Sequence, residues 1–155
     1  KINQSKMDRK ELQNNNPQIV VKAMCIVRNG EKLLLHRGFD EVKGEKFLRL
    51  FGGHVEFEET GEQAVRREMK EETGSDLSEL KFLQATEHMF TYRGKPHHEI
   101  IFLFEGTLVD KALYDKKEFT FEDGGKTIEA GWFSKEDAER EGLPMYPPFP
   151  YFPKK

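Results

Sequence analysis

Residues 52–74 read GGHVEFEETGEQAVRREMKEETG: two adjacent glycines, an acidic loop and a charge-rich segment that ends at a third glycine. The segment from Thr60 to Thr73 predicts a helix, because Thr60 can cap its start and its first turn contains acidic and amide side chains. Gly74 suits the residue after the last helical turn, where a left-handed backbone is common. The stretch therefore predicts a glycine loop that leads into a capped helix.

Three glutamates of this helix lie on one face. Glu68, Glu71 and Glu72 are spaced at i, i+3 and i+4, which spans an arc of roughly 100°. Like charges at this spacing destabilise a helix unless a positive charge lies among them. Because the apolar Ala64 and Met69 lie beside the arc, we expect the carboxylates to face inward or into a cleft.

Clustered carboxylates at a cleft form the kind of oxygen-rich site that Mg²⁺ or Mn²⁺ prefers. Such a metal retains several waters and accepts phosphate oxygens from a substrate, and one activated water can attack phosphorus. The alternative is an ordinary solvated, charge-rich helix, which is the commoner explanation of a Glu-rich helix taken alone.

Two further features of the stretch suit a binding site. Arg67 and Glu59 can form an ion pair that holds the loop against the helix, which we state as a hypothesis. Gly52 and Gly53 allow the backbone to approach a metal or a phosphate closely, because no side chain intervenes.

The spacing of these residues resembles the Nudix box, in which a glycine, five residues, a glutamate and seven residues precede Arg-Glu-apolar-x-Glu-Glu-x-Gly-apolar. The fixed positions are occupied here by Gly53, Glu59, Arg67, Glu68, Met69, Glu71, Glu72 and Gly74. Ser75 stands where an apolar residue is usual, at a position that serves packing in the family. The chain is therefore similar to the MutT-like Nudix hydrolases.

This resemblance implies an α/β fold, the Nudix-type α/β/α sandwich with a mixed β-sheet. It also implies that Glu68 and Glu72 are the principal metal ligands, that Glu71 is a ligand or a base, and that the Gly53 carbonyl is a further ligand. Arg67 and Glu59 would orient these groups. The implied cofactor is Mg²⁺, with Mn²⁺ as an alternative.

The catalytic base varies among Nudix enzymes and often lies outside the box. Glu129 and Glu122 are the candidates here, with Glu129 favoured; for both, a plain surface position is the alternative. Arg37 and His54 are candidates for contacts with substrate phosphates, and Glu122 and Tyr92 for other substrate contacts.

The substrate class is only partly indicated. The proline typical of ADP-ribose members is absent from the region of Phe90 and Thr91, and the coenzyme A motif is not matched before the box. Tyr92 resembles a tyrosine of some diadenosine polyphosphate hydrolases. Nucleoside triphosphates, dinucleoside polyphosphates and capped RNA ends stay open as substrates.

Outside the box, alternation and turn residues predict the remaining elements. Residues 1–18 are polar and Asn-rich, which indicates a flexible N-terminal arm before a single domain over residues 19–155. The predicted strands are Ile19–Arg28, Lys32–Arg37, Phe47–Phe51, Leu80–Tyr92, a central His98–Val109 and Ile128–Phe133, and a short helix follows Ser134 to about Glu141. Residues 39–46 are expected to form a mobile loop, residues 111–126 a polar excursion, and the proline-rich end an extended tail.

Composition limits the class of protein. A net charge of −3 over 155 residues argues against a dedicated DNA-binding module, which would show a basic excess, but allows a small-molecule nucleotide substrate. The single cysteine, Cys25, is expected in the core, and it favours a reducing, cytoplasmic location. No apolar run is long enough for a membrane helix, and a homodimer is compatible with the sequence.

Several aromatic and histidine residues have two interpretations. Trp132 is expected in the core, whereas Phe39, Phe90 and Tyr92 can stack on a base or, more commonly, pack in a core. The histidines at positions 88, 97 and 98 lack the ligand set of a zinc site.

Three hypotheses about function follow. The first is a metal-dependent pyrophosphohydrolase (pyrophosphatase) that cuts a phosphoanhydride bond by attack of water at phosphorus. The second is a catalytically silent nucleotide sensor on the same fold, and the third is a protein-interaction domain that uses the proline-rich tail.

Overall fold

The computed structural model describes residues 17–152, so the predicted flexible arm over residues 1–18 lies almost entirely outside the described residues. Two mixed sheets form the centre of the fold. The first has the strand order β5 (Phe51–His54), β1 (Ile19–Ile26), β7 (Lys95–Leu108) and β6 (Leu77–Tyr92). The second has the order β10 (Met145–Tyr146), β4 (Glu45–Arg49), β3 (Lys32–Asp40), β9 (Lys126–Phe133) and β8 (Glu118–Asp123), with β2 (Arg28–Asn29) paired to β3.

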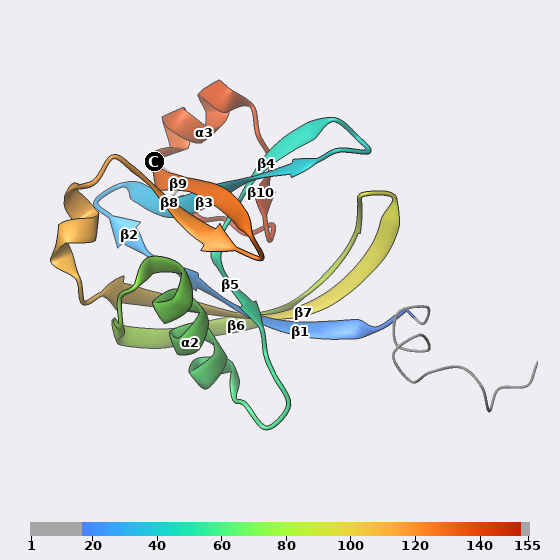
Figure 1. Ribbon diagram of the computed structural model, residues 1–155, viewed down its shortest axis with the longest axis horizontal. Coiled ribbons are helices and arrows are strands. Elements are labelled where there is room, and N and C mark those ends of the chain that lie inside the picture. The colour runs from blue at the N-terminus through green and yellow to red at the C-terminus, as the bar shows by residue number, and fades with distance from the viewer. Residues whose placement is uncertain (1–16, 153–155) are drawn as a thin grey trace, which may run out of the picture.

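The helices lie on opposite sides of these sheets (Figure 1). Helix α2 (Gly61–Thr73) packs on β5 and β1, while the short α3 (Lys135–Glu141) contacts β9 at the other end. A 3₁₀ turn, η2 (Lys111–Asp115), follows β7. The predicted α/β class with helices outside mixed sheets is confirmed. Within residues 17–152 no helix is long and apolar enough to cross a membrane.

Strand β1 is buried on both faces, because its side chains alternate between two hydrophobic clusters. Ala23 and Cys25 face the cluster under α2, which also contains Trp132. Met24 and Ile26 face the cluster on the other side of the sheet. Burial raises the pKa of the Cys25 thiol to about 12, so the predicted inert core cysteine is confirmed.

The prediction of a mobile loop over residues 39–46 was wrong. Phe39 and Asp40 end β3, Glu45 begins β4, and only a short turn separates them. The Asp40 carboxylate orders this turn by accepting backbone N–H groups of Val42 at 3.0 Å and Lys43 at 3.2 Å. It also accepts the backbone N–H of Arg93 at 3.1 Å, which ties the tip of this hairpin to the β6–β7 hairpin.

The polar excursion predicted over residues 111–126 was also wrong in part, since it contains η2 and β8. Strand β8 forms because Phe119 and Phe121 pack into the cluster under α2, while polar residues occupy its other face. Similarly, Met145 and Tyr146 of the proline-rich tail pair with β4 rather than lying free.

Helix α2 owes part of its stability to its first turn. The Thr60 hydroxyl accepts the backbone N–H of Gln63 at 3.1 Å, and the Gln63 side chain accepts the backbone N–H of Thr60 at 2.9 Å. We expect Thr60→Ala to lower the free energy of unfolding by about 1 kcal/mol and Thr60→Ser to retain most of it. Urea unfolding of the three proteins measures this, and equal losses in both variants would contradict the capping role.

The Asp40 contacts predict an effect that depends on pH. Burial raises the pKa of this carboxyl, but the N–H groups of Arg93, Lys43 and Val42 outweigh it and hold the pKa below its ordinary value. The stabilisation is therefore complete above the unfolded pKa of about 4 and is lost as pH falls through the lower folded pKa. We expect Asp40→Asn to be less stable than the parent at neutral pH.

We expect this difference to narrow as pH falls below about 4. Urea unfolding at a series of pH values measures it. A difference between the two proteins that stays constant from neutral to acid pH would show that the carboxylate charge contributes nothing.

Candidate active site

The site is formed by strand β5, by the loop that follows it and by helix α2. The capping box fixes the start of the helix, and Gly74 ends it in the left-handed conformation at φ 78°. Ala64, Val65 and Met69 are buried against the sheets. This orientation places the glutamates of the helix beside β5.

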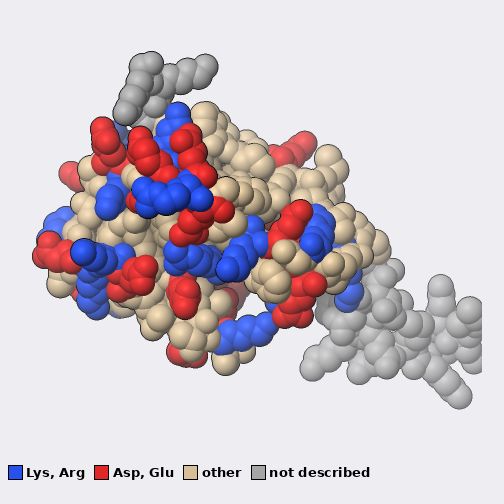
Figure 2. All heavy atoms as spheres, turned by 90° about the horizontal axis from the view of Figure 1, so that it is seen from above, with Lys and Arg blue, Asp and Glu red and all other residues tan. Residues whose placement is uncertain are grey.

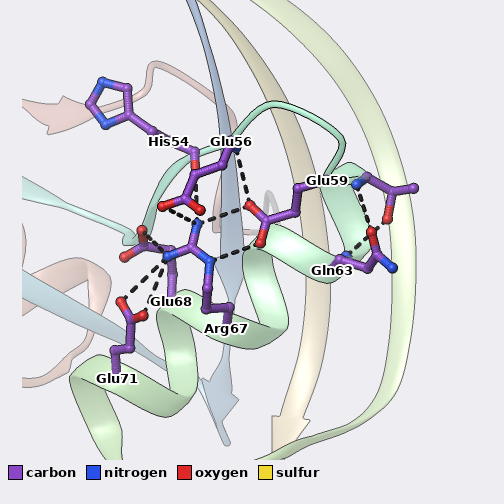
Figure 3. Close-up of polar contacts among 8 residues, drawn as sticks. His54, Glu56, Glu59, Gln63, Arg67, Glu68 and Glu71 are labelled. Atoms are coloured by element: carbon purple, nitrogen blue, oxygen red, sulfur yellow. Dashed lines mark hydrogen bonds and ion pairs between the residues drawn. The ribbon is translucent and has the colours of Figure 1, made fainter.

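Arg67 is the centre of the polar contacts (Figure 3). Its Nε and Nη2 donate to the two carboxylate oxygens of Glu59 at 2.8 and 2.9 Å, a bidentate pair. Its Nη1 donates to Glu68 Oε1 at 3.0 Å, and Nη2 also donates to the backbone carbonyl of His54 at 3.0 Å. The predicted ion pair between Arg67 and Glu59 is therefore present, and it joins the loop to the helix.

The same contacts place a positive charge among the carboxylates, as the spacing on the helix requires. The hydrogen bonds from Arg67 lower the pKa of Glu59 to about 2, so Glu59 is ionised at neutral pH. Arg67 also contacts Glu71, with Nη1 3.4 Å from Oε2, and lies 3.8 Å from a carboxylate oxygen of Glu56.

Glu68 and Glu72 form a separate carboxylate pair. The Glu68 side chain is 17% exposed, and Glu72 Oε2 is buried without a hydrogen-bond partner. Burial, a hydrogen bond with Glu68 and the charge of Glu68 all raise the pKa of Glu72. Two neighbouring carboxyl groups, one with an unsatisfied buried oxygen, would be stabilised by a positively charged ligand.

The backbone of Gly53 lies directly against the Glu68 carboxylate of this pair. A Cβ atom at Gly53 would lie 2.5–2.8 Å from the carboxylate atoms of Glu68, so only glycine fits without displacing that side chain. Gly52 has a φ of +143°, and a Cβ there would lie 2.2 Å from the Ala23 carbonyl oxygen. Glycine is therefore required at position 52 by the backbone of β1, and at position 53 it leaves the Glu68 carboxylate in place.

The three helix carboxylates do not converge. Glu71 is 59% exposed and lies 3.4 Å from Arg67 Nη1, the nitrogen that also donates to Glu68. Glu72 is hydrogen bonded to Glu68. Among residues 17–152 there is no group of three His, Cys, Asp or Glu side chains already spaced to hold an ion. The helix spacing correctly places the glutamates on one face, but the Arg67 guanidinium, and not a shared ion, is what Glu68 and Glu71 both contact.

Several predicted site residues lie elsewhere. Arg37 is bonded to Glu141 of α3, with Nη2 2.7 Å from Oε1, and its guanidinium lies over the Phe133 ring. Glu129 is 72% exposed and lies 4.0 Å from Arg37. Glu122 accepts a hydrogen bond from Thr127 at 2.7 Å.

Strand alternation explains these positions. Phe121 of β8 and Ile128 of β9 face the cluster under α2, so their neighbours Glu122 and Glu129 point to the opposite face of the sheet. The geometry therefore does not favour Glu129 or Glu122 as a base next to Glu72. Asp123, on the same face as Phe121, acts electrostatically on Glu72, and sequence reasoning missed it.

His54 lies close to the carboxylates, whereas Tyr92 lies at the tip of the β6–β7 hairpin. The His54 carbonyl is held by Arg67, while its ring points away from Arg67 in Figure 3. Burial and the charge of Lys22 lower the pKa of this histidine. Tyr92 lines a pocket formed by the two hairpins and donates its hydroxyl to the Phe39 carbonyl at 3.3 Å.

Sequence reasoning also missed three charged residues of that pocket: Lys22, Arg49 and Glu99. Lys22 and Glu99 form an ion pair, with 2.5 Å between Nζ and Oε2 and side-chain exposures of 13% and 5%. The available signal for Lys22 was a single charged residue in the otherwise apolar strand β1.

The contacts of Arg67 predict that a lysine at this position cannot hold the loop against the helix. Lysine retains the charge, but it cannot donate to both Glu59 oxygens, Glu68 and the His54 carbonyl in one fixed geometry. We expect Arg67→Lys to fold and to exchange the backbone amides of Glu56 and Glu59 with solvent deuterium several-fold faster than the parent. Arg66→Lys, on the same helix, is the control, and equal exchange in both variants would contradict the anchoring role.

Comparisons with known proteins identify the family of this chain. The family model described as NUDIX domain matches residues 18–152. An NAD-capped RNA hydrolase NudC of Haemophilus influenzae (strain PittGG) is 31% identical over 134 residues, which are 85% of this chain and 44% of that protein. The chain thus spans less than half the length of the curated relatives it matches.

Solved structures share the fold. A NUDIX hydrolase from Nitrosomonas europaea matches with a TM-score of 0.58 at 22% identity, over 81% of this chain and 78% of that one. A MutT NUDIX hydrolase from Burkholderia pseudomallei matches with a TM-score of 0.53 at 24% identity, over 77% of this chain and 86% of that one. With the family model covering nearly the whole described chain and its box residues gathered around Arg67, the chain belongs to the NUDIX domain family.

Proposed function

We propose that this chain is a metal-dependent pyrophosphohydrolase that cuts a phosphoanhydride bond in a nucleoside diphosphate linked to another group. The observation that carries the proposal is the Glu68–Glu72 pair beside the bare backbone of Gly53, with one buried oxygen of Glu72 unpartnered. Family membership supports the reaction class, since the matched relative is a hydrolase by name.

The residues present fit a divalent cation. All the donors are oxygens, which suits Mg²⁺ or Mn²⁺ better than softer metals. Glu68 and Glu72 would hold the ion, together with the Gly53 carbonyl and, after a side-chain rotation away from Arg67, Glu71. When bound, the cation supplies positive charge to phosphate oxygens and makes a water more acidic.

The side chains of the site orient the carboxylates and balance part of their charge. Arg67 holds Glu59, Glu68 and the His54 carbonyl, so the carboxylates are oriented before a substrate arrives. In the reaction, a water oxygen bonds to one phosphorus and the bridging P–O bond breaks, which leaves two phosphate groups. If Glu71 does not hold the ion, this exposed carboxylate is our candidate to accept the proton that the water loses.

The mixed surface charge suits a small substrate whose phosphate charge would be balanced by a bound cation and not by a basic surface. Figure 2 shows positive and negative side chains interspersed over the face it presents, in keeping with the net charge of −3. Nucleoside triphosphates and dinucleoside polyphosphates are the proposed substrates, and a capped RNA end belongs in the same test because a relative is named for that activity. The homodimer stays a prediction.

A catalytically silent nucleotide sensor is the second candidate. It is favoured by one observation: Glu71 is held by Arg67, and no set of three ligands is formed within the described residues 17–152. Tight binding of an intact nucleotide with no turnover in Mg²⁺ or Mn²⁺ would support the sensor over the hydrolase.

The metal proposal predicts two effects of Glu72→Gln. We expect Mn²⁺ to raise the melting temperature of the parent in a concentration-dependent way, and not that of the variant, because a ligand that binds only the folded state stabilises it. We expect hydrolysis across a nucleotide panel to fall by about 100-fold or more, since even residues behind metal ligands cost 10–100-fold.

Glu62→Gln is the matched control, because Glu62 lies on the same helix and pairs with Arg66 instead. It should keep both the Mn²⁺ response and the activity. Hydrolysis that is indifferent to a chelator, or equal in Glu72→Gln and the parent, would contradict the proposal.

A further inference from the structure

Two side-chain atoms are buried without a hydrogen-bond partner among residues 17–152. One is Oε2 of Glu72, in the carboxylate pair, and the other is Nδ1 of His36, which has no part in the site described above. A buried acceptor that has lost its water without gaining a donor destabilises the folded chain. An arrangement that supplies a donor to both atoms would therefore be favoured.

His36 is fixed in the layer of the fold that contains Glu72. Its ring makes edge contacts with Phe51, at 5.1 Å between centroids and 69° between planes, and with Phe121, at 5.6 Å and 88°. Both phenylalanines belong to the cluster under α2. Two residues beyond Phe121 on β8, Asp123 acts electrostatically on Glu72. The two rings thus hold the imidazole beside the carboxylate pair and limit its rotation.

The imidazole of His36 is a hydrogen-bond acceptor at neutral pH. Burial and the charge of Arg49 lower the pKa of His36 to about 3, so the ring is uncharged. A neutral imidazole carries one proton and has one nitrogen free to accept. The unpartnered Nδ1 is the nitrogen that lacks a donor.

Arg49 is the nearest source of such a donor. It lies directly opposite His36 in the antiparallel β3–β4 pairing, so the two side chains leave the sheet on the same face with neighbouring Cβ atoms. The charge of Arg49 acts on both His36 and Glu72. Within residues 17–152 its guanidinium takes part in no hydrogen bond or salt bridge. One unused donor group therefore neighbours two unused acceptors.

We propose that His36 is a positioning residue: its Nδ1 accepts a hydrogen bond from Arg49 and so holds the guanidinium at the Glu72 carboxylate. Rotation of the Arg49 side chain is sufficient, because the backbone register already places the two residues opposite each other. The planar guanidinium has several N–H groups and can serve both acceptors at once.

The inference rests on the proposed function and deepens it. Arg67 orients Glu68 by donating to its Oε1. In the proposed arrangement Arg49 orients Glu72 in the same way from the other side of the pair, with His36 as its anchor. Partners that orient metal ligands contribute to metal affinity although they do not touch the ion.

The anchoring step can be tested without a metal. His36→Leu removes the acceptor and retains apolar volume, whereas His36→Asn places an oxygen two bonds from Cβ, as Nδ1 is. We expect the Arg49 Nε–H proton to exchange with water several-fold faster in His36→Leu than in the parent, and His36→Asn to restore slow exchange. NMR spectroscopy of the arginine side chains measures this, and equal exchange in all three proteins would overturn the proposal.

The effect on the carboxylate pair is measured by Mn²⁺ binding in the absence of a nucleotide. We expect His36→Leu to weaken the Mn²⁺ affinity in isothermal titration calorimetry by about tenfold or more, and His36→Asn to retain most of it. If His36 acts through Arg49, His36→Leu has no further effect on affinity in an Arg49→Met background. An equal effect of His36→Leu in both backgrounds would contradict the proposal.

An activity measurement separates positioning from a general loss of packing. In His36→Leu the Mn²⁺ concentration that gives half-maximal hydrolysis should rise about tenfold, while KM for the nucleotide at saturating Mn²⁺ changes little. Leu34→Val is the matched control, because Leu34 is 1% exposed in the same cluster and lies two residues away on the same face of β3. A similar loss of Mn²⁺ affinity in Leu34→Val would show that packing alone is responsible.

Two outcomes separate failure of this inference from failure of the proposed function. If His36→Leu releases the Arg49 proton but the parent binds no Mn²⁺, the anchor stands and the metal proposal fails. If the parent binds Mn²⁺ and hydrolyses nucleotides while His36→Leu matches it in every measurement, the positioning role fails. Should His36→Leu not fold, His36→Phe retains a ring without nitrogens and takes the same measurements.

Discussion

The site depends on one guanidinium that satisfies several acceptors at once. Arg67 binds Glu59 through two nitrogens, and it also reaches Glu68 and the His54 carbonyl. These contacts join the loop, the helix and the end of β5 into one unit. A helix with this many carboxylates on one side would repel itself without such a cation, so the same interaction stabilises the fold and orients the site.

The proposed metal site rests on the carboxylate oxygen that Arg67 leaves without a partner. The Oε2 atom of Glu72 is buried without a partner and the side chain lies beside Glu68, so this oxygen is costly in the folded chain. The absence of a Cβ at Gly53 leaves space against the same carboxylates. A protein that retains such an arrangement gives up some stability at the place where a divalent cation would recover it.

The second sheet and the long β6–β7 hairpin line a pocket that is separate from the carboxylate pair. Asp40 joins the tips of the two hairpins that line this pocket. The reaction centre and the pocket thus come from different parts of the chain. Changes in the hairpins can alter the substrate without altering the box.

The sequence alone determined helix α2, because its caps, its buried face and its glutamate spacing are local properties that 3.6 residues per turn convert into one surface. It also indicated the family, the Arg67–Glu59 pair and most strands. It did not determine the β3–β4 turn or β8, whose charged residues resemble loops until Asp40 and Phe121 are buried by distant partners. Nor did it determine the faces of Glu129 and Glu122 or the roles of Lys22 and Arg49, because only the packing of two sheets decides which side of a strand meets the helix and which lines a pocket.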